Sequence, residues 1–80
     1  MNLDEAVNHF AAQETPNGQR TRQALAYRNA LAAGEITSEE YADLLEDLKR
    51  IDHTRTAANE LEQAIIVNQV IDALKALPLP

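Results

Sequence analysis

The chain has 80 residues, with 13 acidic and 7 basic side chains, a net charge of −6 and no cysteine. A chain of this length forms one small domain, residues 1–80, and the lack of cysteine excludes disulfides, thiolate metal sites and a cysteine nucleophile. Hydrophobic residues make up 45% and charged residues 25%, close to the globular average, so we expect a folded protein.

The charge balance and the amino terminus set expectations about partners and location. Nucleic-acid phosphates bind clustered lysine and arginine, so the acidic balance argues against direct contact with nucleic acid. The longest mostly apolar run, residues 64–77, is interrupted by polar side chains and is shorter than the roughly 20 residues of a membrane helix. Asn2, Asp4 and Glu5 stand where a secretory or transit peptide has a basic region, so we expect a cytoplasmic protein without membrane contact.

The first predicted helix begins after Asn2. Apolar residues recur at steps of three and four through residues 3–11, which is typical of an amphipathic helix. Asn2 is a favourable N-cap, and Glu5 stands at the capping-box position three residues later. The residue before a proline is pushed out of helical conformation, so we expect this helix to end near Thr15 and residues 16–18 to form a connecting turn.

A second helix is predicted over residues 19–33, with Ala24, Tyr27 and Leu31 on a thin apolar stripe. Gly34 follows it, at a position where a glycine in left-handed conformation commonly ends a helix. We therefore expect the chain to reverse direction here and to form a helical hairpin around Gly34.

The start of the third helix has the strongest local pattern in the chain. Thr37 is a favourable N-cap, and Glu40 stands at the third helical position to complete a capping box. Ile36 is placed to pack on Tyr41 as a hydrophobic staple. Together these residues predict a helix that begins at residue 38.

The length of this helix has two interpretations. Residues 38–77 contain no glycine or proline, so one helix of about 40 residues is possible, roughly 60 Å long at 1.5 Å per residue. Residues 52–56 have no apolar side chain, which favours a break there, with Thr54 or Thr56 as the cap of a fourth helix. In either case the fold class is all-α, with three or four helices and no strand-like alternation.

The last helix is apolar around more than half of its circumference and therefore needs partners on two sides. The three preceding helices, two of them with narrow apolar faces, are expected to leave part of it uncovered, which favours self-association or a partner protein. The alternative is that this helix is the centre of a compact bundle. The predicted interface consists of Ile65, Ile66, Val67, Val70, Ile71, Leu74 and Leu77.

Six acidic residues and no basic one lie between residues 35 and 47, whereas the preceding helix has three arginines and no acid. Such a polarised charge distribution orients a basic partner or imitates a nucleic-acid backbone. The alternative is a solvated surface that pairs with the arginine-bearing helix, each exposed pair contributing about 0–1 kcal/mol. The predicted acidic face consists of Glu39, Glu40, Asp43, Glu46 and Asp47.

Residues suited to catalysis or metal binding are few and isolated in the sequence. Glu5 and His9 have the spacing of two ligands on one helix face, but no third ligand accompanies them. His53 stands beside Asp52 in the polar segment, and Ser38 has no histidine nearby to activate it. We therefore expect no catalytic residue, metal or cofactor, and a protein that is not an enzyme.

Residues 31–48, LAAGEITSEEYADLLEDL, resemble the short helical motif called the SHOCT domain, which has an A-G-x-I-T turn, E-E-[YF] and a leucine-rich helix. The resemblance covers about residues 29–48. The chain lacks the usual lysines of the motif's second helix and continues for about thirty residues beyond it. Similar stretches occur in small proteins of tailed bacteriophages, and the resemblance implies oligomerisation or protein docking.

These observations predict a small acidic helical protein that acts by contact with other proteins. We expect a homo-oligomer or an accessory component of a larger assembly such as a phage particle, located in the host cytoplasm or the virion. The alternative is an acidic inhibitor that occupies the nucleic-acid-binding site of a host enzyme.

Overall fold

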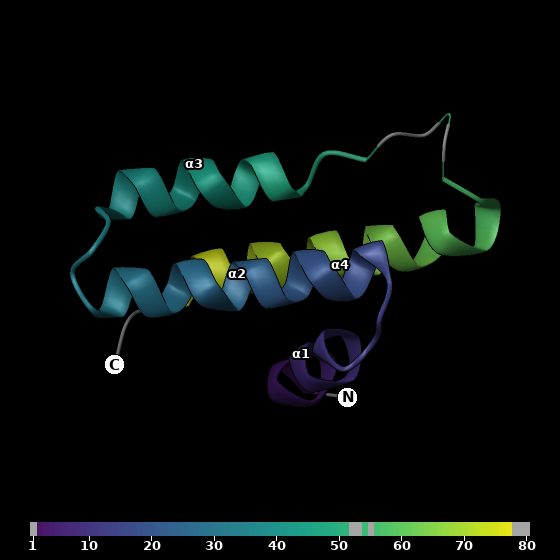
Figure 1. Ribbon diagram of the computed structural model, residues 1–80, viewed down its shortest axis with the longest axis horizontal. Helices are drawn as coiled ribbons and strands as arrows, with labels where there is room; N and C mark the ends of the chain where they lie inside the picture. The colour runs from purple at the N-terminus through teal and green to yellow at the C-terminus, as the bar shows by residue number, and fades with distance from the viewer. Residues whose placement is uncertain (1, 52–53, 55, 78–80) are drawn as a thin grey trace.

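A computed structural model describes residues 2–51, 54 and 56–77, and in this part of the chain the regular secondary structure is helical. The described residues form four helices: α1 (Leu3–Ala11), α2 (Pro16–Ala32), α3 (Ser38–Leu48) and α4 (Ala58–Ala76). The all-α class, the helical hairpin and the predicted number of helices are confirmed (Figure 1).

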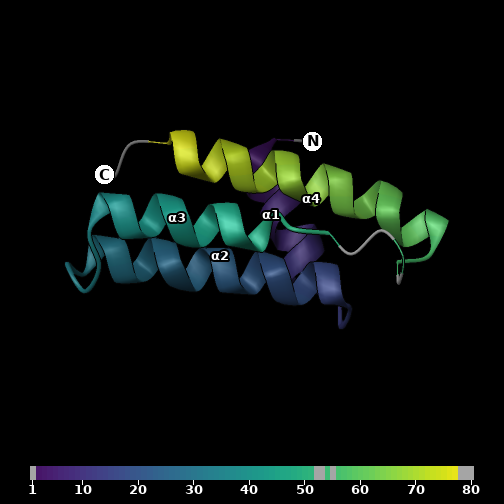
Figure 2. The ribbon, with the colours of Figure 1, turned by 90° about the horizontal axis from the view of Figure 1, so that it is seen from above.

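Helices α2 and α4 form the centre of the bundle, and each of them contacts the three other helices. Helices α1 and α3 lie on opposite sides of this pair and do not touch each other (Figure 1). Seen from above, α2, α3 and α4 run side by side while α1 crosses them (Figure 2). The molecule measures 37 × 26 × 20 Å.

The junction between α1 and α2 differs from the prediction. The side chain of Asn2 accepts the Glu5 amide at 2.8 Å, as expected of an N-cap, but α1 ends at Ala11, before Thr15. The predicted turn at residues 16–18 is wrong, because these residues form the first turn of α2. Thr15 caps that turn by accepting the Gly18 amide at 3.0 Å, and the proline that follows Thr15 occupies a position where its missing N–H is no loss.

The junction between α2 and α3 has the predicted local chemistry. Gly34 has φ +76°, the left-handed conformation that glycine adopts without steric cost. The Gly34 amide donates to Leu31 at 3.0 Å and the Glu35 amide donates to Ala30 at 2.9 Å, which completes a Schellman motif. Both hydrogen bonds of the capping box that starts α3 are present at 3.1 Å.

The predicted break in the long C-terminal helix is confirmed, since α3 ends at Leu48 and α4 begins at Ala58. The predicted caps of α4, Thr54 and Thr56, are wrong. Ala57 is the N-cap of α4, and it makes no side-chain hydrogen bond to the helix.

The hydrophobic core draws on every helix, and α4 supplies its largest share. Short side chains on α2, such as Ala24 and Thr21, are fully buried, which lets the neighbouring helices approach closely. The buried apolar residues of the core cluster are Val7, Phe10, Ala24, Tyr41, Leu45, Val67, Val70, Ile71 and Leu74.

Candidate interaction surfaces

Four of the seven predicted interface residues belong to the chain's own core. Val67 and Ile71 are 0% exposed, Leu74 is 4% exposed and Val70 is 7% exposed. Because the other three helices enclose these side chains, no partner reaches them in this structure, and the prediction of an interface there is wrong. This burial agrees with the alternative, in which the last helix is the centre of a compact bundle.

The other three predicted interface residues lie on the surface of α4 and at its end. Ile65 is 49% exposed, Ile66 is 44% exposed and Leu77 is 43% exposed. Single exposed apolar side chains are common in soluble proteins, so these three define only a small apolar surface.

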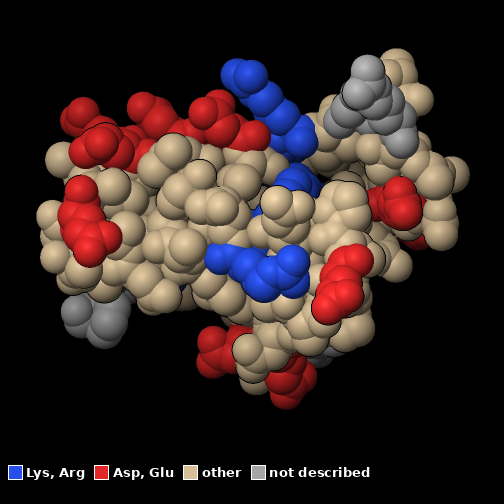
Figure 3. Space-filling view, in the orientation of Figure 1, with Lys and Arg blue, Asp and Glu red and all other residues tan. Residues whose placement is uncertain are grey.

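All five residues of the predicted acidic face are exposed. Acidic side chains gather along the edge of the molecule that α3 forms (Figures 1 and 3). We call Glu39, Glu40, Asp43, Glu46 and Asp47 the acidic surface of α3.

The carboxylates of the acidic surface of α3 differ in how far they are neutralised. Glu40 accepts the Thr37 amide in the capping box, and Glu46 accepts hydrogen bonds from two lysines. Asp47 makes a 3.6 Å ion pair with Arg50, both side chains being largely exposed. Within the described part of the chain, no hydrogen bond or ion pair involves the side chains of Glu39 and Asp43.

The three arginines of α2 do not reach the acidic surface of α3. Each donates instead to a carbonyl near the C-terminal end of another helix: Arg22 to Ala11 of α1 at 2.8 Å, Arg20 to Leu48 of α3 at 2.6 Å, and Arg28 to Leu74 of α4 at 3.2 Å. Helix ends carry unpaired carbonyls with partial negative charge, which guanidinium groups satisfy well. The predicted pairing of this surface with the arginine-bearing helix is therefore wrong.

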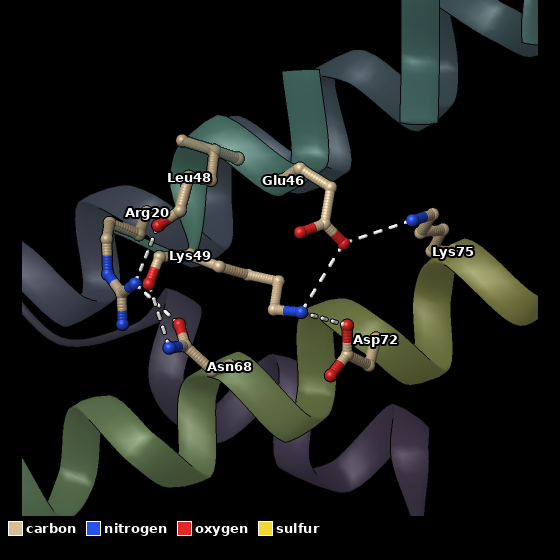
Figure 4. A network of polar contacts seen from close by, with 7 residues as sticks. All are labelled: Arg20, Glu46, Leu48, Lys49, Asn68, Asp72 and Lys75. Carbon is tan, nitrogen blue, oxygen red and sulfur yellow. Dashed lines mark hydrogen bonds and ion pairs between the residues drawn. The ribbon is translucent and has the colours of Figure 1, made fainter. Parts of the chain in front are cut away.

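Arg20 is the centre of a polar network that joins α2, α3 and α4 (Figure 4). Its Nη1 also donates to Oδ1 of Asn68 at 2.7 Å, and its Nη2 donates to the carbonyl of Ala64 at 3.1 Å. The Asn68 amide group in turn donates to the carbonyl of Lys49 at 2.9 Å. Burial lowers the pKa of Arg20 from its ordinary value, because desolvation disfavours the charged form.

A second set of contacts ties α3 to α4 through charged groups (Figure 4). Lys49 pairs with Asp72 at 2.7 Å, and Lys75 pairs with Glu46 at 3.0 Å. The hydrogen bonds from Lys75 and Lys49 lower the pKa of Glu46 below its ordinary 4.5. The hydrogen bond to Asp72 raises the pKa of Lys49 above its ordinary 10.5.

The sequence did not predict that the arginines cap other helices. The one sign of this role in the sequence is that Arg20, Arg22 and Arg28 lie on a helix without any acid to pair with. The carbonyl partners lie 9 to 46 residues away along the chain, so no local spacing identifies them.

A hollow of about 320 Å³ lies between the start of α2, the end of α3 and the start of α4. Its lining includes Arg20, whose guanidinium is occupied by the contacts given above, and the exposed Arg50. Among the described residues, no three metal-ligating side chains come together. His9 is exposed beside Gln13, at 3.2 Å, while Asp52 and His53 lie outside the described residues.

No described helix combines the length and the hydropathy that crossing a membrane requires. Protein-family models, curated proteins and solved structures gave no match to the chain. The resemblance of residues 29–48 to the SHOCT motif therefore stays a prediction.

Proposed function

We propose that this chain is a binding module that docks the acidic surface of α3 onto a basic surface of another protein. The observation that supports the proposal is that the arginines of α2 bond to carbonyls, and that Glu39 and Asp43 are exposed without a hydrogen bond or ion pair in the described part of the chain. Unneutralised charges on one side of a small molecule raise the rate of encounter with a partner of opposite charge.

The spacing of the carboxylates indicates which basic surface they fit. Glu39, Asp43 and Asp47 recur every four residues and lie along one side of α3, about 6 Å apart. The five carboxylates of the acidic surface of α3 occur about once per 3 Å of helix axis, close to the roughly 3.4 Å per phosphate of one nucleic-acid strand. A protein surface that binds nucleic acid is therefore a fitting partner, and the module acts as its inhibitor or regulator.

A second candidate function is assembly through α4, as a homo-oligomer or as an accessory part of a larger particle such as a phage virion. The exposure of Ile65, Ile66 and Leu77 favours it. The substitution that tests it is Ile66→Asp, because Ile71→Asp would place a charge in the core and unfold the monomer. Light scattering after size-exclusion chromatography should show an oligomer for the natural chain and a folded monomer for Ile66→Asp; a folded monomer in both cases contradicts this candidate.

The experiment for the acidic surface of α3 uses two triple variants of equal net charge. The first, Glu39→Gln with Asp43→Asn and Asp47→Asn, neutralises the surface but keeps the capping glutamate and the lysine-bound Glu46. The control variant is Asp4→Asn with Glu14→Gln and Glu62→Gln, at exposed positions outside α3.

Each immobilised protein is exposed to a set of purified DNA-binding proteins, with free DNA as a competitor. The natural chain and the control should retain the same proteins, the α3 variant should lose them, and DNA should displace them from the natural chain. Equal retention by all three chains contradicts the proposal.

A further inference from the structure

We propose that the groove in which α1 lies is a binding site for an amphipathic helix of another protein, and that α1 occupies the site until such a helix displaces it. The groove is formed by α2 and α4, because α1 contacts these two helices and does not contact α3. This site is separate from the acidic surface of α3, which lies on the other side of the α2–α4 pair (Figure 1).

Helix α1 has the form of a ligand for such a groove. It is nine residues long, and its two buried side chains, Val7 and Phe10, are each 6% exposed. Leu3 and Ala6 are partly buried and pack against the same core. Apolar residues at steps of three and four are the means by which amphipathic helices bind the apolar grooves of other proteins. Helices α2 and α4 therefore already hold one helix in the way in which they would hold a partner's.

The groove also fixes the direction of the helix that lies in it. Arg22 on α2 donates through Nη1 to the carbonyls of Ala11 and Gln13, both at 2.8 Å. These carbonyls belong to the C-terminal end of α1 and to the residues just beyond it, where a helix has unpaired carbonyls. A partner helix that replaces α1 would therefore place its own C-terminal carbonyls at Arg22.

The start of α2 is formed without help from α1. Thr15 accepts the Gly18 amide at 3.0 Å, and Pro16 follows at the first helical position. Thr15 itself is extended, with φ −134° and ψ 164°. Since this cap lies in the connecting segment, α1 can leave the groove on residues 12–14 without unwinding α2.

Strong polar contacts hold α2, α3 and α4 together independently of α1. Arg20 joins α2 to α3 and α4 through the bonds given above, and Tyr41 on α3 donates to the carbonyl of Leu74 on α4 at 3.3 Å. The bonds from Arg22 to the end of α1 are exposed to solvent instead. Departure of α1 breaks none of the contacts among α2, α3 and α4, so α1 should open at a lower free energy than the whole chain.

Hydrogen exchange of the natural chain tests whether α1 opens separately. After correction for intrinsic rates, amides in the last turn of α1 should exchange at least about tenfold faster than amides at the centre of α2 and α4. Exchange of the α1 amides only together with those of α2 and α4 would overturn the proposal.

A fluorescent synthetic peptide of residues 2–13 is the probe for the groove, with binding measured by anisotropy. The natural chain should bind it weakly, because its own α1 competes at a high effective concentration. In the full chain, Phe10→Ala weakens this competitor and leaves α2 and α4 unchanged, so the affinity for the natural-sequence peptide should rise about 100-fold. A peptide that itself carries Phe10→Ala should lose its binding.

Two further full-chain variants complete the experiment. Val7→Ala is a milder change than Phe10→Ala and should raise the affinity for the peptide about tenfold. Asn8→Ala, on the exposed side of α1, is the matched control and should leave this affinity unchanged. Circular dichroism of each variant should show that α2, α3 and α4 remain folded.

Three outcomes of these binding measurements would also overturn the proposal. The first is equal affinity of the peptide for the natural chain, Val7→Ala and Phe10→Ala. The second is complete unfolding of both variants, which would make α1 an inseparable part of the core. The third is a dimer of the natural chain that Phe10→Ala removes, which would assign the groove to α1 of a second copy.

Discussion

At the residue scale, the arginines of α2 donate hydrogen bonds to backbone carbonyl groups of the other helices, and these bonds explain much of the fold. The C-terminal turn of a helix carries unpaired carbonyls and about half a negative charge. Helix α2 supplies one arginine to such a turn in each of the three other helices. The planar guanidinium of Arg20 bonds two helices at once, which the single ammonium of a lysine reproduces poorly.

Replacement of Arg20 by glutamine should lower the free energy of unfolding by about 2–3 kcal/mol. The change leaves the carbonyls of Leu48 and Ala64 without a charged donor, and bonds of this kind contribute about 1.5–3 kcal/mol. Urea denaturation followed by circular dichroism measures the loss. The control Arg50→Gln, at a side chain that is 85% exposed, should stay within about 0.5 kcal/mol. Equal effects of the two variants would contradict the capping role.

Gly18 is required for a different reason, the close approach of two backbone segments. A Cβ atom at this position would lie 2.0 Å from the carbonyl oxygen of Gln13. Gly18→Ala should therefore lower the free energy of unfolding by about 1–3 kcal/mol, although alanine favours helices. Gln23→Ala on the exposed side of the same helix is the control and should change it by less than about 0.5 kcal/mol. An unchanged thermal midpoint for Gly18→Ala would show that the turn is looser than described.

At the scale of elements, α3 is held on α4 by charged contacts near its C-terminal end. Glu46 is bound by Lys75 and Lys49, and Lys49 also binds Asp72. The residues that make these contacts are far apart in the sequence, so no local pattern predicts them. The contacts also make the docking of α3 dependent on pH.

The sign of the pH dependence follows from the pKa of Glu46. The bound lysines lower this pKa in the folded state, so the stabilisation is present above the ordinary value of 4.5 and is lost as the pH falls through the lower folded value. Glu46→Gln should therefore lose less stability between about pH 6 and pH 3 than the natural chain does. Denaturant midpoints at both pH values measure this difference. Identical losses in the two proteins would contradict the contribution of Glu46.

The elements that the sequence predicted well are those with local causes. Thr37, Glu40 and Gly34 act on residues within five positions, so the end of α2 and the start of α3 followed from their spacing. The predicted start of α2 was wrong, because residues 16–18 have the composition of a turn, whereas in the structure they form the first turn of a helix that Thr15 caps. The caps supplied by the arginines depend on residues that are distant in the sequence, and no local pattern predicts them.

On the scale of the whole molecule, burial separates α4 into a core side and a surface side. The apolar pattern alone did not distinguish them, because it covers more than half of the helix. Ile71 is fully buried and Ile66 is 44% exposed, only five residues apart. The apolar faces of α1, α2 and α3 are small, but together they bury the core side of α4.

This division predicts unequal effects of truncation on α4. Ile71→Ala should lower the free energy of unfolding by about 2–5 kcal/mol, because it opens a cavity in the core. Ile66→Ala should change it by less than about 1 kcal/mol. Chemical denaturation of both variants measures the difference. Similar losses would contradict the placement of Ile66 on the surface.

The proposed function is that the acidic surface of α3 binds a basic protein surface. The most direct test is to measure the affinity for one of the retained DNA-binding proteins at two salt concentrations. The natural chain and the control variant, which is altered at Asp4, Glu14 and Glu62, should bind this partner with equal affinity. Their affinity should fall steeply as the salt concentration rises, because salt screens exposed charges. The α3 variant, which is altered at Glu39, Asp43 and Asp47, should have an affinity at least about tenfold lower at low salt. Most of the salt dependence should also disappear. Equal affinities and equal salt dependence for all three chains would contradict the claim.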